Sequence, residues 1–170
     1  DIEYFPNEHY GYNNLGNLYL KGKGCEVDYK KAFEYFTEGV KRGSSYSKYH
    51  LAEMHFEGQY VNKDIDKGMM YLQQAMDENM VEAYLYYVSL LMKGKYVEKD
   101  EDKAFEVLKK AIDADSNNRA FKELIERVKN GDFGSELEDI YRAYDFSKKL
   151  VAEKTYLADD LVELRDYYFD

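Results

Sequence analysis

A pattern that recurs every 36 residues constrains the fold of this chain more than any other feature. The apolar segment that ends at Gly22 recurs with the same spacing before Gly58 and before Gly94, and a weaker fourth copy ends at Gly131. A fixed period of roughly 20–50 residues is typical of proteins that stack one supersecondary unit on the next. The 170 residues therefore hold four such units.

Each unit is predicted to be a pair of helices. Apolar residues spaced by three and four precede each glycine, which places them on one helical face, and glycine ends the helix because it tolerates left-handed backbone. The second helix begins at an aspartate, whose side chain caps free backbone amides and whose charge suits the positive end of the helix dipole. A small residue four positions later lets the two helices approach closely. The capping aspartates are Asp28, Asp64, Asp100 and Asp139.

The residues that carry this pattern in the first unit are Leu15, Gly16, Tyr19, Gly22, Gly24, Asp28, Lys31 and Ala32. Their spacing is similar to that of Sel1-like repeats, which are relatives of tetratricopeptide repeats, and the similarity extends over roughly residues 9–152. The resemblance implies an all-α fold, a right-handed α-solenoid of about four helix-turn-helix repeats in a single domain over residues 1–170. The expected repeats are 9–43, 44–79, 80–115 and 116–152.

Residues 155–169 are predicted to form one more helix, with Leu157, Leu161 and Leu164 on one face and acidic residues largely opposite. A stack of repeats exposes the apolar side of its last unit, so we expect this helix to cap the array. Two alternatives stay open. The helix could fold back into the groove of the array, or Gly134-Ser135 could be an artificial junction to a tethered peptide, although the fourth aspartate motif follows it in nearly the expected place.

The composition excludes several classes of function. A formal net charge of -10 disfavours binding to nucleic acid, which requires clusters of lysine and arginine. No apolar run is long enough to insert directly into a membrane. The single cysteine weakly favours a reducing compartment, so we expect a cytoplasmic protein, while the start at Asp1 leaves room for a removed targeting segment.

The sequence contains no recognisable catalytic motif, so we expect no enzyme, no cofactor and no metal site. His50 and His55 are five residues apart and project to different faces of a helix, which argues against a shared metal ion, and His55 is expected in the core or the groove. Cys25 has no evident base beside it in sequence and is interpreted as a buried structural thiol. Gly22-Lys23-Gly24 lacks the strand and the Lys-Ser/Thr of a phosphate-binding loop.

In repeats of this kind the first helix of every unit lines the concave side of the array, so a partner-binding groove is expected there. By position, the groove residues carried over from the family are Asn13, Asn17, Leu20, Tyr46, Tyr49, Glu53, Phe56, Glu57, Leu85, Ser89, Met92 and Lys93. A merely solvated groove would be polar, whereas the second and third units offer an apolar stripe that is typical of partner surfaces. The alternative is that the array buries this stripe itself. The stripe is Tyr46, Tyr49, Phe56, Leu85 and Met92.

These observations predict a non-catalytic adaptor or scaffold that binds a partner helix or extended peptide in the groove. The acidic rim favours a protein partner with apolar anchors and flanking basic residues. One alternative is a regulatory or structural segment of a larger protein that self-associates as a homo-oligomer. Another is a secreted enzyme that binds β-lactams or peptidoglycan, which the resemblance ties to units held by disulfides, while Cys25 stands alone.

Overall fold

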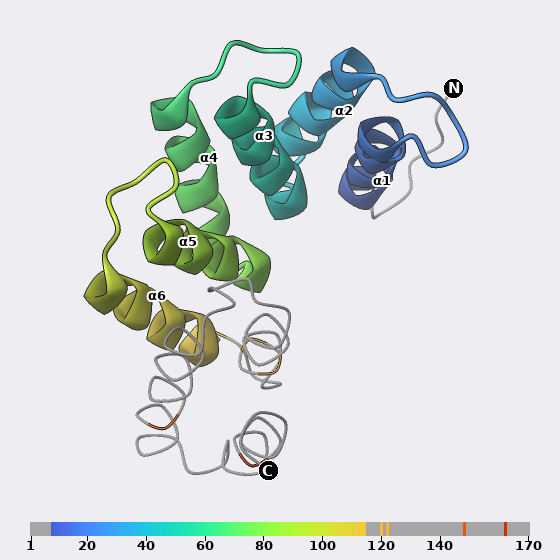
Figure 1. The fold of residues 1–170 in the computed structure, drawn as a ribbon. Helices are drawn as coiled ribbons and strands as arrows, with labels where there is room; N and C mark the ends of the chain where they lie inside the picture. The colour runs from blue at the N-terminus through green and yellow to red at the C-terminus, as the bar shows by residue number, and fades with distance from the viewer. Residues whose placement is uncertain (1–7, 115–119, 121, 123–147, 149–161, 163–170) are drawn as a thin grey trace. The chain divides into compact units, whose positions relative to one another are not determined.

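The computed structural model describes residues 8–114 together with residues 120, 122, 148 and 162, and over this part of the chain it contains helices and no strand (Figure 1). The helices follow one another as three pairs, so the first three predicted units are confirmed as helical pairs. Their bounds are α1 Glu8–Lys21, α2 Tyr29–Lys41, α3 Ser45–Glu57, α4 Ile65–Asp77, α5 Val81–Lys93 and α6 Glu101–Ala114. The predicted fourth repeat, with Asp139, and the predicted helix 155–169 lie outside the described residues.

The chain divides into two compact units, and the boundary lies within α5. Unit 1 is Asp1–Ala83 and unit 2 is Tyr84–Asp170. Unit 1 contains the first two helical pairs and the beginning of α5, and unit 2 contains the rest of α5 and all of α6. The site described below lies entirely within unit 1.

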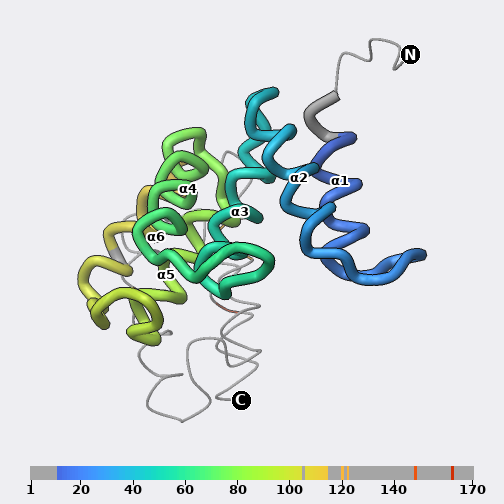
Figure 2. The backbone as a smooth tube through the Cα atoms, turned by 90° about the horizontal axis from the view of Figure 1, so that it is seen from above, coloured from blue at the N-terminus to red at the C-terminus, as the bar shows by residue number. Residues whose placement is uncertain are grey.

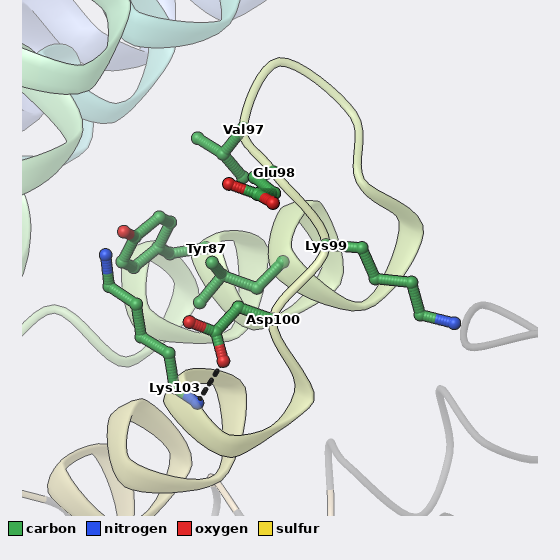
Figure 3. A pocket seen from close by; sticks show the side chains of 7 residues that line it. Tyr87, Val97, Glu98, Lys99, Asp100 and Lys103 are labelled. Atoms are coloured by element: carbon green, nitrogen blue, oxygen red, sulfur yellow. Dashed lines mark hydrogen bonds between the residues drawn. The ribbon is translucent and has the colours of Figure 1, made fainter.

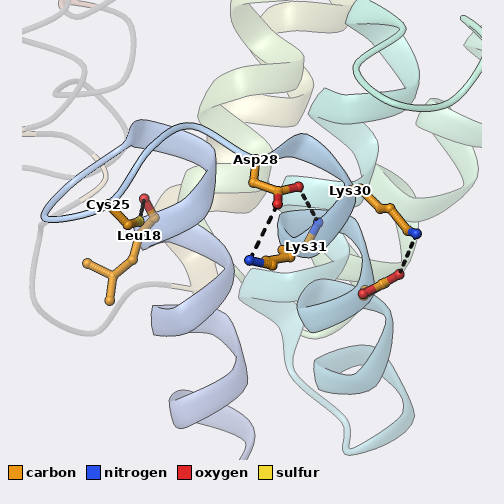
Figure 4. A network of polar contacts seen from close by, with 6 residues as sticks. Leu18, Cys25, Asp28, Lys30 and Lys31 are labelled. Atoms are coloured by element: carbon orange, nitrogen blue, oxygen red, sulfur yellow. Dashed lines mark hydrogen bonds and ion pairs between the residues drawn. The ribbon is translucent and has the colours of Figure 1, made fainter.

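Aspartate side chains begin the second helix of each pair, as the sequence predicts. The carboxylates of Asp28, Asp64 and Asp100 each accept a hydrogen bond from the backbone N–H three residues later, at 3.0, 2.9 and 2.9 Å. Figure 4 shows this contact between Asp28 and Lys31 at the start of α2. The backbone hydrogen bond from Lys31 also lowers the pKa of Asp28 from its ordinary value, because it stabilises the ionised carboxylate.

The loop between the two helices of a pair keeps one backbone conformation although its sequence changes. Gly22, Gly58 and Gly94 end the first helices with φ of 65°, 72° and 64°, the left-handed conformation in which glycine avoids a steric penalty. Two residues further on, Tyr60 and Tyr96 adopt φ of 67° and 66° where the first loop has a glycine. The aromatic departures from the repeat pattern therefore leave the loop backbone unchanged, at a cost of about 1–2 kcal/mol each.

Within each pair of unit 1, a glycine on one helix accommodates a phenylalanine on the other. A Cβ atom at Gly16 of α1 would stand 2.4 Å from the ring of Phe36 on α2. In the second pair the roles are exchanged, because a Cβ atom at Gly68 of α4 would stand 2.6 Å from the ring of Phe56 on α3. Both phenylalanines are fully buried, so the fit between small and large residues fixes how closely each pair packs.

The two pairs of unit 1 share a core between α2 and α3. Ala32 and Phe36 of α2 pack with Leu51 and Met54 of α3 in one buried cluster, and partly buried residues such as Leu20 border it. Figure 2 shows α2 packed against α1 on one side and α3 on the other. Stacking of consecutive pairs through such faces is how a repeat protein gains stability.

Candidate functional site

A polar network joins the first helices of the two pairs in unit 1. Asn17 of α1 donates from Nδ2 to Nε2 of His50 on α3, over 2.9 Å. The other ring nitrogen of His50, Nδ1, lies 2.9 Å from Oε2 of Glu53, one turn further along α3. Because the amide nitrogen of Asn17 can only donate, Nε2 of His50 is its acceptor, and the ring proton is on Nδ1, which donates to Glu53. The predicted groove residues Asn17 and Glu53 are thus connected through a histidine.

Aromatic rings hold His50 in place. The Phe36 ring of α2 stacks on the imidazole with centroids 4.7 Å apart, and the Tyr49 ring meets its edge with centroids 5.2 Å apart. His50 is 9% exposed, so packing as well as hydrogen bonding fixes its orientation. His50 is not among the groove residues predicted from the sequence. Its spacing of three residues from Glu53 was the available signal, because residues three apart share a helical face.

Two asparagines one turn apart on α1, one of which belongs to this network, carry unpaired acceptors. The Oδ1 atoms of Asn13 and Asn17 are both buried and have no hydrogen-bond partner among the described residues. Asn13 as a whole is 8% exposed. A buried acceptor without a donor costs about 1–3 kcal/mol. An N–H donor that reached either atom would remove this cost.

Two glutamates near the junction of α4 and α5 contact residues of α3. The hydroxyl of Tyr46 on α3 donates to Oε1 of Glu82 on α5 over 3.3 Å. Glu78 accepts from Ser45 Oγ over 2.6 Å and pairs with Lys48 Nζ. Burial opposes ionisation of Glu78, but the hydrogen bonds from Lys48 and Ser45 outweigh it and lower its pKa from the ordinary value. Glu78 is therefore ionised at neutral pH.

The name "α1/α3 strip" is used below for Asn13 and Asn17 of α1 together with Tyr46, Tyr49, His50 and Glu53 of α3, which are joined across the two helices by the contact between Asn17 and His50. Tyr46 is 36% exposed, and Tyr49 and Glu53 are half-buried. The two tyrosines therefore keep apolar surface that a partner can contact.

Several predicted groove residues are placed elsewhere. Phe56 is fully buried against Gly68, whose missing side chain makes room for the ring, so the expectation that Phe56 lines an open groove is wrong. Leu85 is also fully buried, which likewise removes it as an exposed anchor. Ser89 is 8% exposed and donates to the carbonyl oxygen of Tyr86. Leu20 packs against the core cluster of unit 1.

The remaining predicted groove residues are exposed or half-buried. Glu57 at the end of α3 and Lys93 at the end of α5 are exposed, and Met92 is half-buried. Glu57 belongs to unit 1, while Met92 and Lys93 belong to unit 2. Their role as partner contacts stays a prediction.

His55 lies in the core among aromatic rings. Its imidazole stacks on Tyr71 with centroids 5.7 Å apart and meets Phe33 edge-on at 6.1 Å, and its Nδ1 atom is buried without a partner. Burial lowers the pKa of His55 from its ordinary value of 6.5, and the positive charge of Lys67 adds to this effect. His55 is therefore neutral at pH 7.

The prediction that Cys25 is a buried thiol is wrong. Cys25 lies in the loop between α1 and α2 and is exposed, with its Sγ atom 3.6 Å from the carbonyl oxygen of Leu18 (Figure 4). The loop residues around it are exposed as well, because this loop extends beyond the helices and contributes nothing to the core.

A cavity of about 360 Å³ lies in unit 2 beside the loop between α5 and α6. Tyr87, Asp100 and Lys103 lie around it (Figure 3). Hydrogen bonding to Tyr87 raises the pKa of Lys103. Acidic and basic side chains both line the cavity, so its charge favours neither an anion nor a cation.

The described residues contain neither a metal-binding cluster nor a helix able to span a membrane. No group of three or more histidine, cysteine, aspartate or glutamate side chains is arranged to hold a metal ion there. None of the helices in the same part of the chain combines the length and the apolar character needed to span a membrane.

Comparison with known proteins gives a consistent result. The sequence profile of the Sel1 repeat matches three times, at residues 9–44, 45–80 and 81–116. No curated protein sequence matches the chain. Among solved structures, a Sel1 repeat protein from Oxalobacter formigenes superposes with a TM-score of 0.60 and 23% identity, over 83% of this chain and 56% of its own.

Two further structures share the fold. A protective antigen of uropathogenic Escherichia coli with an SLR fold superposes with a TM-score of 0.55 and 18% identity, over 85% of this chain and 30% of its own. Cysteine rich protein B of Helicobacter pylori gives a TM-score of 0.50 and 23% identity, over 64% of this chain and 86% of its own. The chain thus spans about half or less of the length of the first two structures.

Proposed function

Because the chain belongs to the Sel1 repeat family, whose members generally mediate protein–protein interactions, we propose that it is a non-catalytic adaptor that holds a partner segment on the α1/α3 strip. The partner is a peptide or helix with apolar anchors and flanking basic residues. The proposal is thus more specific than the general role of the family in two ways: it names one surface of unit 1 and one class of partner.

The observation that carries the proposal is the pair of unpaired acceptors on α1. Native proteins pair nearly all buried polar atoms, so each exception calls for an explanation. Asn13 Oδ1 and Asn17 Oδ1 lie one helical turn apart, as do successive contacts along a helical surface. Both atoms are covered in this structure, so a partner segment with two N–H donors would satisfy them once the asparagine side chains turn toward it.

The surroundings of the strip support the remaining features of the partner. Tyr46 and Tyr49 supply aromatic surface, which is enriched among residues that dominate binding energy. Glu53 and, one turn later on α3, Glu57 add acidic side chains to this surface, and complementary charge favours lysine or arginine on the partner.

The test is selection of binding peptides from a random display library on the immobilised chain. We expect enrichment of peptides with one or two aromatic or aliphatic residues flanked by lysine or arginine. The paired variant Tyr46→Ala with Tyr49→Ala should retain less than a tenth of the enrichment, because both anchors lose their contact area. The matched control is Tyr29→Ala, which removes an exposed tyrosine of α2.

Circular dichroism of all three proteins shows whether the variants stay folded. Enrichment of acidic peptides, or equal enrichment on the folded paired variant, would contradict the proposed partner and the proposed surface respectively.

A further inference from the structure

The first helices of the two pairs in unit 1, α1 and α3, carry equivalent apolar faces. The repeat period makes each residue of α1 equivalent to the residue 36 positions later on α3. The name "α1 end face" is used below for Gly11, Asn14, Leu15 and Leu18. The equivalent residues of α3 are Ser47, His50, Leu51 and Met54.

The two equivalent faces differ completely in burial. Leu51 and Met54 are 1% and 0% exposed, while Leu15 and Leu18 are 40% and 41% exposed. Gly11 and Asn14 are exposed as well. Figure 4 shows the Leu18 side chain pointing away from α2, beside the exposed Cys25. A pair of leucines in these positions is therefore unpartnered among the described residues of unit 1.

The structure shows what covers the equivalent face. On α2, Ala32, Phe36 and Gly39 follow one another at intervals of four and three residues, which forms one stripe along the helix. Ala32 and Phe36 pack in one cluster with Leu51 and Met54. A Cβ atom at Gly39 would stand 2.2 Å from Ser47 Oγ. The glycine therefore allows the close approach of the two helices.

The same stripe suits the α1 end face. Gly11 stands where α3 has Ser47, and outside the local backbone of α1 no atom of the described residues lies within 4 Å of the position that its Cβ would occupy, so a close helix crossing is open there. Asn14 stands where α3 has His50, which stacks on Phe36. The leucines stand where Leu51 and Met54 meet the stripe, with comparable apolar volume.

We infer that the α1 end face is a docking site for a helix of a partner protein that carries a small residue, an aromatic residue four positions later and a glycine three positions after that. This helix adds to the array as α2 adds to α3. The site is distinct from the α1/α3 strip, so it gives the chain a second interaction surface that does not depend on the proposed function.

The probe is a synthetic peptide that copies residues 28–43 of this chain. A short helix is only marginally stable alone, so a staple joins positions 30 and 34, whose side chains are exposed on α2 and lie one turn apart. A fluorophore on Cys25, the single cysteine of the chain, reports docking because its sulfur lies beside Leu18. The same peptide with Phe36→Asp is the matched control ligand.

We expect saturable binding of the peptide, weakened at least tenfold by the peptide change and by Leu15→Asp with Leu18→Asp in the protein. The protein control is Met70→Asp with Tyr29→Asp, two exposed apolar residues outside the face, which should keep the affinity. Loss on the leucine variant separates docking on α1 from invasion of the peptide between α2 and α3.

Each of four results would overturn the inference. The first is no saturable binding, and the second is equal affinity for the leucine variant. The third is a melting temperature of the leucine variant far below that of the control variant, because the face would then be covered by the chain itself. The fourth is self-association of the unmodified chain that the leucine variant abolishes in sedimentation, because the face would then belong to a second copy.

Discussion

At the scale of single residues, the two histidines of α3 have different surroundings and different roles. His50 is fixed by two hydrogen bonds and belongs to the α1/α3 strip, whereas His55 is enclosed by Phe33 and Tyr71 and has an unpaired ring nitrogen. The sequence shows that the two residues project to different faces. It does not show which face is covered, because that depends on the helix packed against it.

His55 makes the stability of the chain depend on pH. Its pKa in the folded chain is below 6.5, so between the two values the unfolded chain binds a proton that the folded chain does not. The free energy of unfolding should therefore fall as the pH drops below about 6.5. The substitution His55→Leu should remove this part of the fall in unfolding free energy. Leucine is the residue at the equivalent position 91 of unit 2, so we expect it to fit.

Urea unfolding of both proteins between pH 5 and pH 8 measures the effect. The difference in unfolding free energy between them isolates His55 from the other titrating groups. A difference that stays constant over this range would mean that His55 has the same pKa in both states.

At the scale of helices, the packing of each pair depends on matched residue sizes. Where the first pair has Leu20 and Ala32, the second pair has Phe56 and Gly68 at the equivalent positions. A small residue follows each capping aspartate in the sequence, which predicts that the two helices of a pair approach closely. The structure confirms this close approach at Gly68. The sequence does not predict that Phe56 fills the space, because a large residue on the first helix fits the groove pattern equally well.

Gly68→Ala should destabilise unit 1 by about 1–3 kcal/mol, because the added methyl group meets the Phe56 ring at 2.6 Å. Phe56→Leu alone should also destabilise, through the cavity it leaves. The double variant recreates the combination of the first pair, so it should be more stable than the sum of the two single effects indicates. Denaturant unfolding of the four proteins gives the coupling energy.

Additive effects, with no coupling between positions 56 and 68, would show that the two residues do not limit one another. Asp66→Ala, an exposed substitution near Gly68 in the first turn of α4, is the control for nonspecific loss of helix stability.

At the scale of the whole molecule, the 36-residue period predicted the all-helical repeat fold, the glycines that end the first helices and, within the described residues, the aspartates that begin the second helices. Burial at the edges of the pairs was not predictable in the same way. Leu15 and Leu51 look alike in sequence, yet only Leu51 is covered, because α2 packs on α3. The burial of Cys25 was predicted wrongly for a related reason, because its loop extends beyond the helices and does not contribute to the core.

The proposed binding site was predictable in part. Asn13, Asn17, Tyr46, Tyr49 and Glu53 were predicted from their positions, and the structure places them on α1 and α3. The contribution of His50 depends on its contact with Asn17, 33 positions away, which a repeat pattern does not reveal. Nor does the pattern show which buried acceptors lack a donor.

The central claim is that the unpaired acceptors of α1 serve a bound partner, and Asn13→Leu tests it most directly. Leucine occupies the equivalent position 85 in unit 2, so we expect the substitution to fit. Removing a buried acceptor that lacks a donor should raise the unfolding free energy by about 1 kcal/mol. Titration with a peptide obtained by display selection should at the same time show at least tenfold weaker binding. A stabilised variant that binds this peptide with unchanged affinity would contradict the account.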